Sequence, residues 1–328
     1  MQPYRLGFAV KVLGAGGLRT ADTRRWQSGP HLVRSLEYLE RVFDYLDSID
    51  VRVYRLSSQV IPYGTHPDLP QFDYRRQLDE ATAAVESLAA KANALGLRLS
   101  THPGQYTVLN ARDDSITAKA IADLEQDALL LDRLGQPAEG SVVVHVGGGY
   151  GDRPAALDRW AQAWERLSPR AQARLSLEND EHIFGLADVL ELHRRTGVRV
   201  VLDVHHHRIH RQAGMPLDEA MRAAVATWPP GVRPKVHLSS ASTMIEGGLE
   251  AAGSRWAFPR LRAHADLVTP WDLEATVRAA PVPLDVMLEA KAKDLALLQL
   301  RRTSADVRPE IGALEERTAA TVKSRQGG

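Results

Sequence analysis

The sequence contains no cysteine, and this absence narrows the chemistry that the protein can perform. Disulfide bonds and thiolate metal sites are excluded, so any metal ion must be held by histidine and carboxylate side chains. The chain also lacks an excess of charge of either sign, because 41 Lys and Arg residues balance 41 Asp and Glu residues. This balance neither requires nor excludes a nucleic-acid partner. To bind nucleic acid, the protein would need its basic residues gathered on one face.

Long hydrophobic runs are absent as well. No apolar stretch approaches the roughly 20 residues that a membrane-spanning helix needs. Lys11 and Arg19 interrupt the N-terminal segment, where a signal peptide would require an apolar core. We therefore expect a soluble, cytoplasmic protein with no membrane partner, and the sequence indicates no obligate protein partner.

Strand-like and helix-like patterns alternate along nearly the whole chain. Runs typical of strands lie at 5–10, 51–56, 98–101, 141–146, 174–177, 198–204, 234–238 and 284–289. Stretches typical of helices lie between them, at 31–48, 74–95, 116–134, 153–167, 185–196, 217–227 and 270–279. Pro154, Pro216 and Pro270 stand where three of these helices would start, which is a favoured position for proline.

This alternation predicts an α/β protein built as a closed (β/α)8 TIM barrel. We expect one domain over residues 1–295, with the active site at the C-terminal mouth of the strands. Residues 296–328 are expected to form a C-terminal extension that is helical in part and ends in a mobile polar tail. The alternative fold is an open, doubly wound sheet.

Six successive strand-like segments end in a histidine or a carboxylate, and this repetition is the most informative feature of the chain. The residues are His102, His145, Glu178, Asp203, His237 and Glu289. A closed parallel barrel brings such strand ends to one mouth, whereas an open sheet gathers its site at one switch point. The spread therefore favours the barrel. Ligands of these types suit Mn²⁺, Fe²⁺ or Zn²⁺, and their number predicts more than one ion.

Lys235 stands two residues before His237, so both side chains are expected on the same face of one strand. If His237 points into the barrel, a bare ammonium there would be repelled by divalent cations. Two solutions remain open. Lys235 pairs with a carboxylate, or its amine reacts with carbon dioxide to give an anionic carbamate, which is a good metal ligand.

Further polar residues follow the strand-like segments. The turn at Pro103 and Gly104 is expected to project Gln105 and Tyr106 beyond the barrel mouth. His206 is assigned to the loop after Asp203. His205 and His207, which flank it, are expected to be solvent-facing loop imidazoles, and His264 by itself is typical of a surface histidine.

A cluster of two or three ions at such a mouth fits phosphodiester hydrolysis, because the ions clamp a phosphate and stabilise the attacking and leaving oxygens. An aldose–ketose isomerase also uses carboxylates and histidines at a barrel mouth, and it is the second hypothesis. A protein that binds DNA without cutting it is the third, although such a protein has no use for a complete set of ligands.

Seven segments of the sequence resemble signature blocks of the UV damage endonucleases. They are IPYGTHPDLP (61–70), THPGQY (101–106), VVVHVGGGYG (142–151), LSLENDE (175–181), VVLDVHHH (200–207), RPKVHLSS (233–240) and DVMLEAKAK (285–293). The resemblance implies a (β/α)8 barrel of the endonuclease IV-like and xylose isomerase-like group. It also implies incision of double-stranded DNA immediately 5′ of UV photoproducts, leaving a 3′-hydroxyl and a 5′-phosphate, and thus association with the nucleoid.

The resemblance further implies a cluster of two to three divalent ions, commonly Mn²⁺. One ion would be held by His102, His145 and Glu178, a second by Glu178, Asp203, His237 and Glu289, and a third by His206 and His264. The modified lysine of the family falls on Lys235, so that Glu178, Lys235, His237 and Glu289 are the expected catalytic set. Gln105 and Tyr106 match the pair that probes the lesion, and His66 lies in a block at the rim of the site.

One block departs from the family. Residues 6–12 read LGFAVKV, where some members carry a tyrosine and, a few residues later, an asparagine near the substrate. The roles of those two groups are therefore not expected here. Lys11, in the same block, is a candidate contact to a phosphate.

Overall fold

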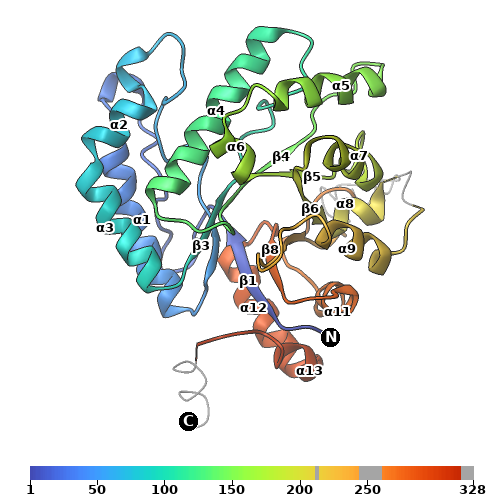
Figure 1. Ribbon diagram of the computed structural model, residues 1–328. Helices are drawn as coiled ribbons and strands as arrows, with labels where there is room; N and C mark the ends of the chain where they lie inside the picture. Colours follow the sequence, from blue (N-terminus) through green and yellow to red (C-terminus); the bar gives the residue numbers. More distant parts are fainter. Residues whose placement is uncertain (211–213, 244–260, 319–328) are drawn as a thin grey trace, which may run out of the picture.

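Eight parallel strands close into a barrel in the order β1 to β8, and helices surround it (Figure 1). The computed structural model describes residues 1–210, 214–243 and 261–318. The strands are β1 (Tyr4–Ala9), β2 (Val53–Arg55), β3 (Arg98–Thr101), β4 (Ser141–His145), β5 (Leu175–Glu178), β6 (Arg199–Asp203), β7 (Lys235–Leu238) and β8 (Leu284–Leu288). Pairing of β1 with β8 closes the ring. The predicted (β/α)8 barrel is confirmed, and the open sheet is excluded.

The helices run back along the outside of the barrel. They are α1 (Leu32–Ser48), α2 (Tyr74–Glu80), α3 (Thr82–Ala94), α4 (Asp114–Arg133), α5 (Arg153–Trp164), α6 (Pro169–Arg174), α7 (Leu186–Thr196), α8 (Val204–Ile209), α9 (Leu217–Val225), α11 (Pro270–Ala279), α12 (Lys293–Val307) and α13 (Pro309–Gly312). Two short 3-10 helices lie at Trp26–Ser28 and Pro70–Phe72. None of the helices in the described ranges is long and apolar enough to cross a membrane.

Local capping explains where several helices begin. Asp152 accepts a hydrogen bond from Ala155 N at the start of α5, and Thr269 accepts one from Asp272 N at the start of α11. Proline occupies the first turn of both helices, as expected, because its missing N–H has no partner to lose there. The helix expected over 74–95 is two helices instead, since the backbone at Ala81 leaves the helical conformation.

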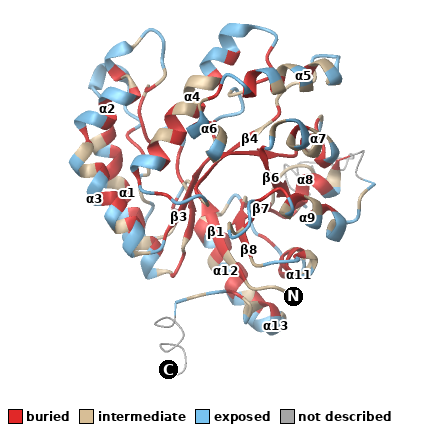
Figure 2. Ribbon diagram, in the orientation of Figure 1, coloured by how far each residue is buried: buried red, intermediate tan, exposed pale blue. Residues whose placement is uncertain are grey.

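The strands separate two buried regions, one apolar and one containing charged side chains. Between strands and helices the buried residues are apolar, and Figure 2 shows the inner faces of the helices as buried. Inside the barrel, Asp285 accepts hydrogen bonds from Arg5 at 2.7 Å and from Arg98 at 2.5 Å near the N-terminal ends of the strands. Small apolar side chains such as Ala9 and Val53 lie between this network and the C-terminal mouth of the barrel. The interior of the barrel below the mouth is therefore filled by side chains.

The chain after β8 is fastened to the barrel. Glu315 forms a β-bridge with Tyr4, and Arg301 binds the Glu315 carboxylate at 2.8 Å and the carbonyl of Asp50 at 2.8 Å. These contacts hold α12 and α13 against the rest of the domain. The polar tail predicted at the C-terminus lies, from residue 319 onward, outside the described residues.

Candidate metal centre

The six strand-end residues meet at the mouth of the barrel in two overlapping groups. Each group consists of residues whose potential ligand atoms all lie within 4.8 Å of one another. The first group is His102, His145 and Glu178, and the second is Glu178, Asp203, His237 and Glu289. Residues that are far apart in sequence are thus brought together by strands β3 to β8, because parallel strands of a barrel end at the same face.

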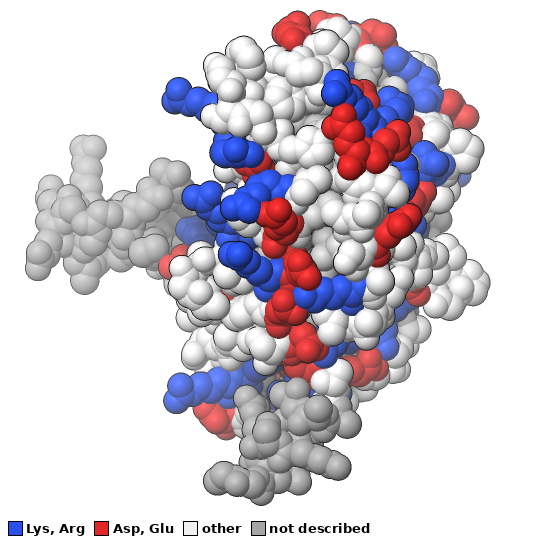
Figure 3. All heavy atoms as spheres, turned by 90° about the vertical axis from the view of Figure 1, so that its left-hand side faces the viewer, with Lys and Arg blue, Asp and Glu red and all other residues white. Residues whose placement is uncertain are grey.

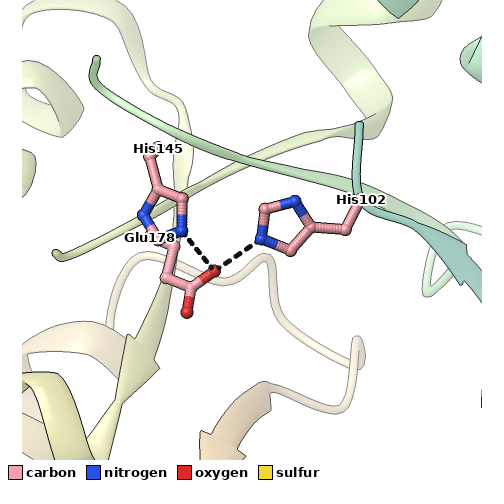
Figure 4. A group of neighbouring side chains, drawn as sticks. All are labelled: His102, His145 and Glu178. Atoms are coloured by element: carbon pink, nitrogen blue, oxygen red, sulfur yellow. Dashed lines mark hydrogen bonds and ion pairs between the residues drawn. The ribbon is translucent and has the colours of Figure 1, made fainter. Parts of the chain in front are cut away.

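Glu178 belongs to both groups and lies between them. Its carboxylate is fully buried at the end of β5. One oxygen lies 3.1 Å from His102 Nε2 and 3.7 Å from His145 Nε2, as Figure 4 shows. The other oxygen lies 2.9 Å from His237 Nδ1. Because each oxygen faces a different group, Glu178 could bridge two ions.

The second group concentrates negative charge in a buried place. The pKa of the Asp203 carboxyl is raised by burial and by the neighbouring charges of Glu178 and Glu289. Burial also acts to raise the pKa of Glu178 and of Glu289. In Glu178 the interactions with His237, His145 and His102 prevail, and in Glu289 those with Arg55 and His237 prevail, so that both pKa values lie below the usual range. Such a cluster needs cations to offset its charge.

A buried oxygen of the second group tests whether a metal fits. Asp203 Oδ2 is buried and has no hydrogen-bond partner. Native proteins rarely leave such atoms without a partner. Histidine and carboxylate donors that converge in this way are a suitable ligand set for divalent transition metals, so the residues fit a metal cluster.

Neighbouring groups fix the ligands in place. Asn179 accepts a hydrogen bond from Asp203 N at 2.9 Å and donates one to Asp203 O at 3.1 Å. His264 Nδ1 lies 2.8 Å from the carbonyl oxygen of Glu289. Such outer partners orient metal ligands and set the tautomer of ligating histidines.

His206 and His264 also reach the centre, and their rings lie 5.5 Å apart. His206 lies 3.7 Å from Asp203 and 3.6 Å from Glu181. Burial alone would lower the pKa of the His206 imidazole, but the negative charges of Asp203, Glu178 and Glu181 outweigh it and raise this pKa to about 9. These two histidines thus share one negatively charged corner of the mouth.

The assignment of His206 to a loop was wrong, and so was the exposure expected for its neighbours. Asp203 accepts a hydrogen bond from His206 N at 2.8 Å, which caps a helix, α8, directly after β6. The helix buries His205 and His207 to 3% and 5% exposure. His207 Nε2 lies 2.9 Å from Met215 O, and the His205 ring lies 5.6 Å from that of His264.

Lys235 lies inside the barrel on the same strand as His237, and its side chain is almost completely buried. Its Nζ atom has no hydrogen-bond partner. Among the described residues, no carboxylate lies within ion-pair distance of Nζ, so of the two solutions left open, the pairing with a carboxylate is not found there. Burial, together with the nearby charge of Arg98, holds the pKa of the Lys235 amine well below its usual value.

The turn after β3 separates two cavities at the rim. Tyr106, at its tip, is 83% exposed, and Gln105 beside it is also exposed. A cavity of about 400 Å³ on one side is lined by Tyr106 and His66. A cavity of about 600 Å³ on the other side extends from Tyr106 to His102 and His145. The residues expected to probe a lesion therefore stand between two hollows next to the metal centre.

Sequence comparison assigns the chain to a family. The model of the UV-endonuclease UvdE family matches residues 32–316. The chain belongs to this family of endonucleases. A UV DNA damage endonuclease of Bacillus cereus (strain B4264) is 30% identical over 275 residues, which cover 82% of this chain and 81% of the relative.

Solved structures support the fold of this UvdE-family chain. The crystal structure of SacUVDE superposes with a TM-score of 0.77 at 24% identity and covers 93% of this chain and 99% of its own. Endonuclease IV from Thermus thermophilus superposes with a TM-score of 0.55 at 18% identity, covering 92% and 99%. At these identities the likeness establishes a shared barrel fold.

One residue of the mouth was missed by sequence reasoning in this UvdE-family chain. Arg55 ends β2, and its guanidinium forms an ion pair with Glu289. Only histidines and carboxylates at strand ends indicate a metal site, and an arginine is not a metal ligand. The signal was nevertheless present, because the second strand-like segment ends in Tyr-Arg-Leu.

A buried carboxyl in the wall of the smaller cavity gives the first prediction, which concerns stability. Burial, with the nearby charge of Asp123, raises the pKa of Asp127 on α4 to about 7. In the unfolded chain this carboxyl ionises near pH 4. Between about pH 4 and pH 7, the folded state therefore binds one proton more than the unfolded state. The free energy of unfolding falls as pH rises through this range.

We expect Asp127→Asn to remove this dependence, because asparagine cannot ionise. At pH 8 the variant should exceed the wild type in free energy of unfolding by about 2–4 kcal/mol, whereas near pH 4 the two should be similar. Urea unfolding at both pH values measures the difference. An equal difference at both would contradict the assignment of the titration to Asp127.

Proposed function

We propose that the protein is a metal-dependent DNA repair endonuclease. It hydrolyses the phosphodiester bond immediately 5′ of UV photoproducts, both cyclobutane dimers and 6-4 photoproducts, in double-stranded DNA, and leaves a 3′-hydroxyl and a 5′-phosphate. The observation that carries the proposal is the pair of ligand groups sharing Glu178 at the mouth of the barrel, in a chain of the UV-endonuclease family. Curated relatives of similar length are named UV DNA damage endonucleases.

Two to three ions, with Mn²⁺ as the favoured metal, are part of the proposal. His102, His145 and Glu178 would hold one ion, Glu178, Asp203, His237 and Glu289 a second, and His206 with His264 a third. Divalent ions there would supply stabilisation of negative charge on a phosphodiester and activation of the attacking water. Oxygen-rich and imidazole-rich ligand sets of this kind accept Mn²⁺ readily.

The side chains of the centre would prepare the site for that chemistry. Glu178 positions His237 at 2.9 Å and His102 at 3.1 Å, and Glu289 approaches the same nitrogen of His237, Nδ1, at 3.2 Å. These contacts hold the rings in fixed orientations before a substrate arrives. Such preorganisation places charge where it develops in the transition state and avoids rearrangement during the reaction.

Carbamylation of Lys235 is part of the proposal, because Nζ is buried and unpartnered and because burial, which lowers the pKa of the amine, favours its neutral form. The neutral amine adds to the carbon of carbon dioxide, a nitrogen–carbon bond forms, and one proton is released. The anionic carbamate would offset the neighbouring charges of Arg98 and Arg55, both of which act on Lys235.

The second prediction tests this modification. Protein equilibrated with ¹³C-bicarbonate is expected to show one carbamate carbon signal in ¹³C NMR. The signal should be absent in Lys235→Met, which keeps a long apolar chain in the barrel but cannot form a carbamate. A wild-type spectrum without the signal at high bicarbonate, with no added mass on Lys235, would remove the modification from the proposal.

Lesion recognition is assigned to the tip of the turn after β3. A tyrosine and a glutamine on a short turn can wedge into a duplex and occupy the space of an unstacked lesion. Photoproducts are already poorly stacked, so they are extruded at a lower cost than normal bases. Basic side chains for the backbone are available although the chain is neutral overall. On the face shown in Figure 3, Lys and Arg predominate along the left-hand edge.

The third prediction follows from this assignment. Tyr106→Ala should reduce the preference for a lesion-containing duplex over an undamaged one by about tenfold, since stacking on an aromatic ring contributes about 1–3 kcal/mol. Gln105→Ala should act in the same direction. Tyr106→Phe is the matched control, because it keeps the ring and should retain most of the preference. Competition binding measures the ratio, and an equal loss of affinity for both duplexes would contradict this role.

The decisive experiment is strand incision on end-labelled duplexes that carry one defined photoproduct. We expect a single nick immediately 5′ of the lesion that requires Mn²⁺, and none in an undamaged control. If folded, metal-loaded protein binds the damaged duplex but never cuts it, the protein is a damage-binding protein. If it neither binds nor cuts, a sugar isomerase or epimerase of the same barrel group becomes the function to test.

A further inference from the structure

Three cations lie side by side at the part of the mouth formed by the ends of β1, β2 and β8. Arg55 ends β2, Lys11 follows β1, and Lys293 is the first residue of α12 after β8. These three strands are neighbours in the barrel. We call Lys11, Arg55 and Lys293 the basic arc. It borders the metal centre directly, because Arg55 forms an ion pair with Glu289.

The backbone that carries the basic arc is fixed by specific contacts. Val10 N donates a hydrogen bond to Arg55 O at 2.9 Å, which places Lys11 beside the end of β2. Asp294 accepts hydrogen bonds from Leu13 N and Gly14 N, both at 2.8 Å. This carboxylate therefore fastens the loop after Lys11 to the residue that follows Lys293.

The fixed loop leaves no room for a larger residue at Gly14. A Cβ atom at this position would lie 2.4 Å from the hydroxyl of Tyr45 and 2.8 Å from Asp294 Oδ2. The Tyr45 hydroxyl itself donates a hydrogen bond to Asp294 at 2.8 Å. The buried carboxylate of Asp294 therefore holds three elements together, namely the loop after Lys11, the start of α12 and helix α1.

Two residues of this region adopt a backbone conformation that side chains normally avoid. Val10 has a φ of 60° and Lys293 a φ of 52°. For a β-branched residue such as valine this conformation is an outlier. Strained residues of this kind persist only where the surrounding structure imposes them, and they concentrate at functional sites. The strain is therefore located at Lys293, a member of the arc, and at Val10, next to Lys11.

Among the described residues, only one of the three cations of the arc, Arg55, forms an ion pair with a carboxylate. Arg55 contacts Glu289, but its Nε atom is buried and has no hydrogen-bond partner. Neither Lys11 nor Lys293 takes part in an ion pair within the described part of the chain. Burial and the nearby positive charge of Arg55 lower the pKa of the Lys293 amine, which reflects this crowding of cations. A bound anion would offset the repulsion among these three cations.

We propose that the basic arc binds a phosphate of the incised strand next to the candidate metal centre. This inference rests on the proposed function. The arc borders the ligand groups at Glu289, through the ion pair with Arg55. The cavity that extends from Tyr106 reaches the same groups at His102 and His145. A strand whose lesion lies at Tyr106 and whose scissile bond lies at the ligand groups would therefore bring a neighbouring phosphate to the arc.

The first test measures how salt affects binding of a duplex with one photoproduct, in EDTA so that no incision occurs. Each phosphate neutralised by a lysine contributes about −0.9 to the slope of log K against log [salt]. The double variant Lys11→Ala/Lys293→Ala should therefore bind more weakly and show a slope smaller in magnitude by about one to two units. Lys91→Ala is the control, since Lys91 lies in the last turn of α3 and pairs with Asp44 at 2.7 Å.

The second test identifies the phosphate. A single methylphosphonate, which removes one backbone charge, is placed in turn at each position 5′ and 3′ of the scissile bond. Neutralising the contacted phosphate should weaken wild-type binding about tenfold and should have no effect on the double variant. Equal sensitivity of the wild type and the double variant at every position would overturn the proposal.

The outcomes separate the two proposals. If the wild type cuts at the lesion but the double variant and Lys91→Ala show the same salt slope as the wild type, the basic arc is not a phosphate site and the proposed function stands. If the wild type neither binds nor cuts damaged duplex, the proposed function fails first. Lys11→Ala alone, at an exposed position, repeats the slope measurement without altering the strained residue at 293.

Discussion

Glu178→Gln is expected to reduce incision by about 1,000-fold or more while leaving binding of the damaged duplex largely intact. Glutamine keeps the size of the side chain but cannot place a negative oxygen in each of the two ligand groups that share this position. Removal of one preorganised electrostatic contact at a reacting centre commonly costs about 10²–10³ in rate, and here both groups lose a ligand.

Metal content and rate should fall together in this variant. Elemental analysis of the dialysed protein should show fewer bound ions than in the wild type, and single-turnover incision should show the loss of rate. Glu181→Gln is the matched control, because Glu181 lies 3.6 Å from His206 but belongs to neither ligand group. We expect it to lose less than about tenfold. Full metal content and activity in Glu178→Gln would refute the shared role of this residue.

Asp285→Ala is expected to destabilise the fold by about 3–5 kcal/mol, which is typical when one partner of a buried ion pair is removed. Asp285 is fully buried, and it binds Arg5 and Arg98 below the metal centre. Despite burial, these two arginines hold the pKa of its carboxyl below the usual range. Without it, Arg98 would keep a buried charge whose Nη2 atom already lacks a hydrogen-bond partner.

Urea unfolding of the variant and the wild type measures this loss. Asp218→Ala removes a carboxylate from an exposed ion pair with Arg222 on α9 and should change stability little, because such pairs contribute little in water. Equal effects of the two substitutions would contradict the role of Asp285 as the counter-charge of the two arginines inside the barrel. A low incision rate in Asp285→Ala that recovers on cooling would show that the defect is one of folding.

Prediction from sequence was most successful where short-range pattern decides the structure. All eight strands lie where apolar runs predicted them, because a strand buried on both faces must be apolar over its length. The boundary of one helix was missed at Ala81, where no proline or glycine marks the break. Helix α8 was missed because its start depends on a cap from Asp203, a residue that had been assigned only a ligand role.

The sequence by itself determined which residue types end the strands, and thus that histidines and carboxylates would gather at the mouth of a barrel. Strand alternation is a local property, so it can be read without coordinates. Only the tertiary structure decided that Glu178 stands between the two ligand groups, that Lys235 has no described partner, and that Arg55 pairs with Glu289. These facts depend on side-chain distances across the barrel. Closure of the sheet sets these distances, so they cannot be predicted from the sequence alone.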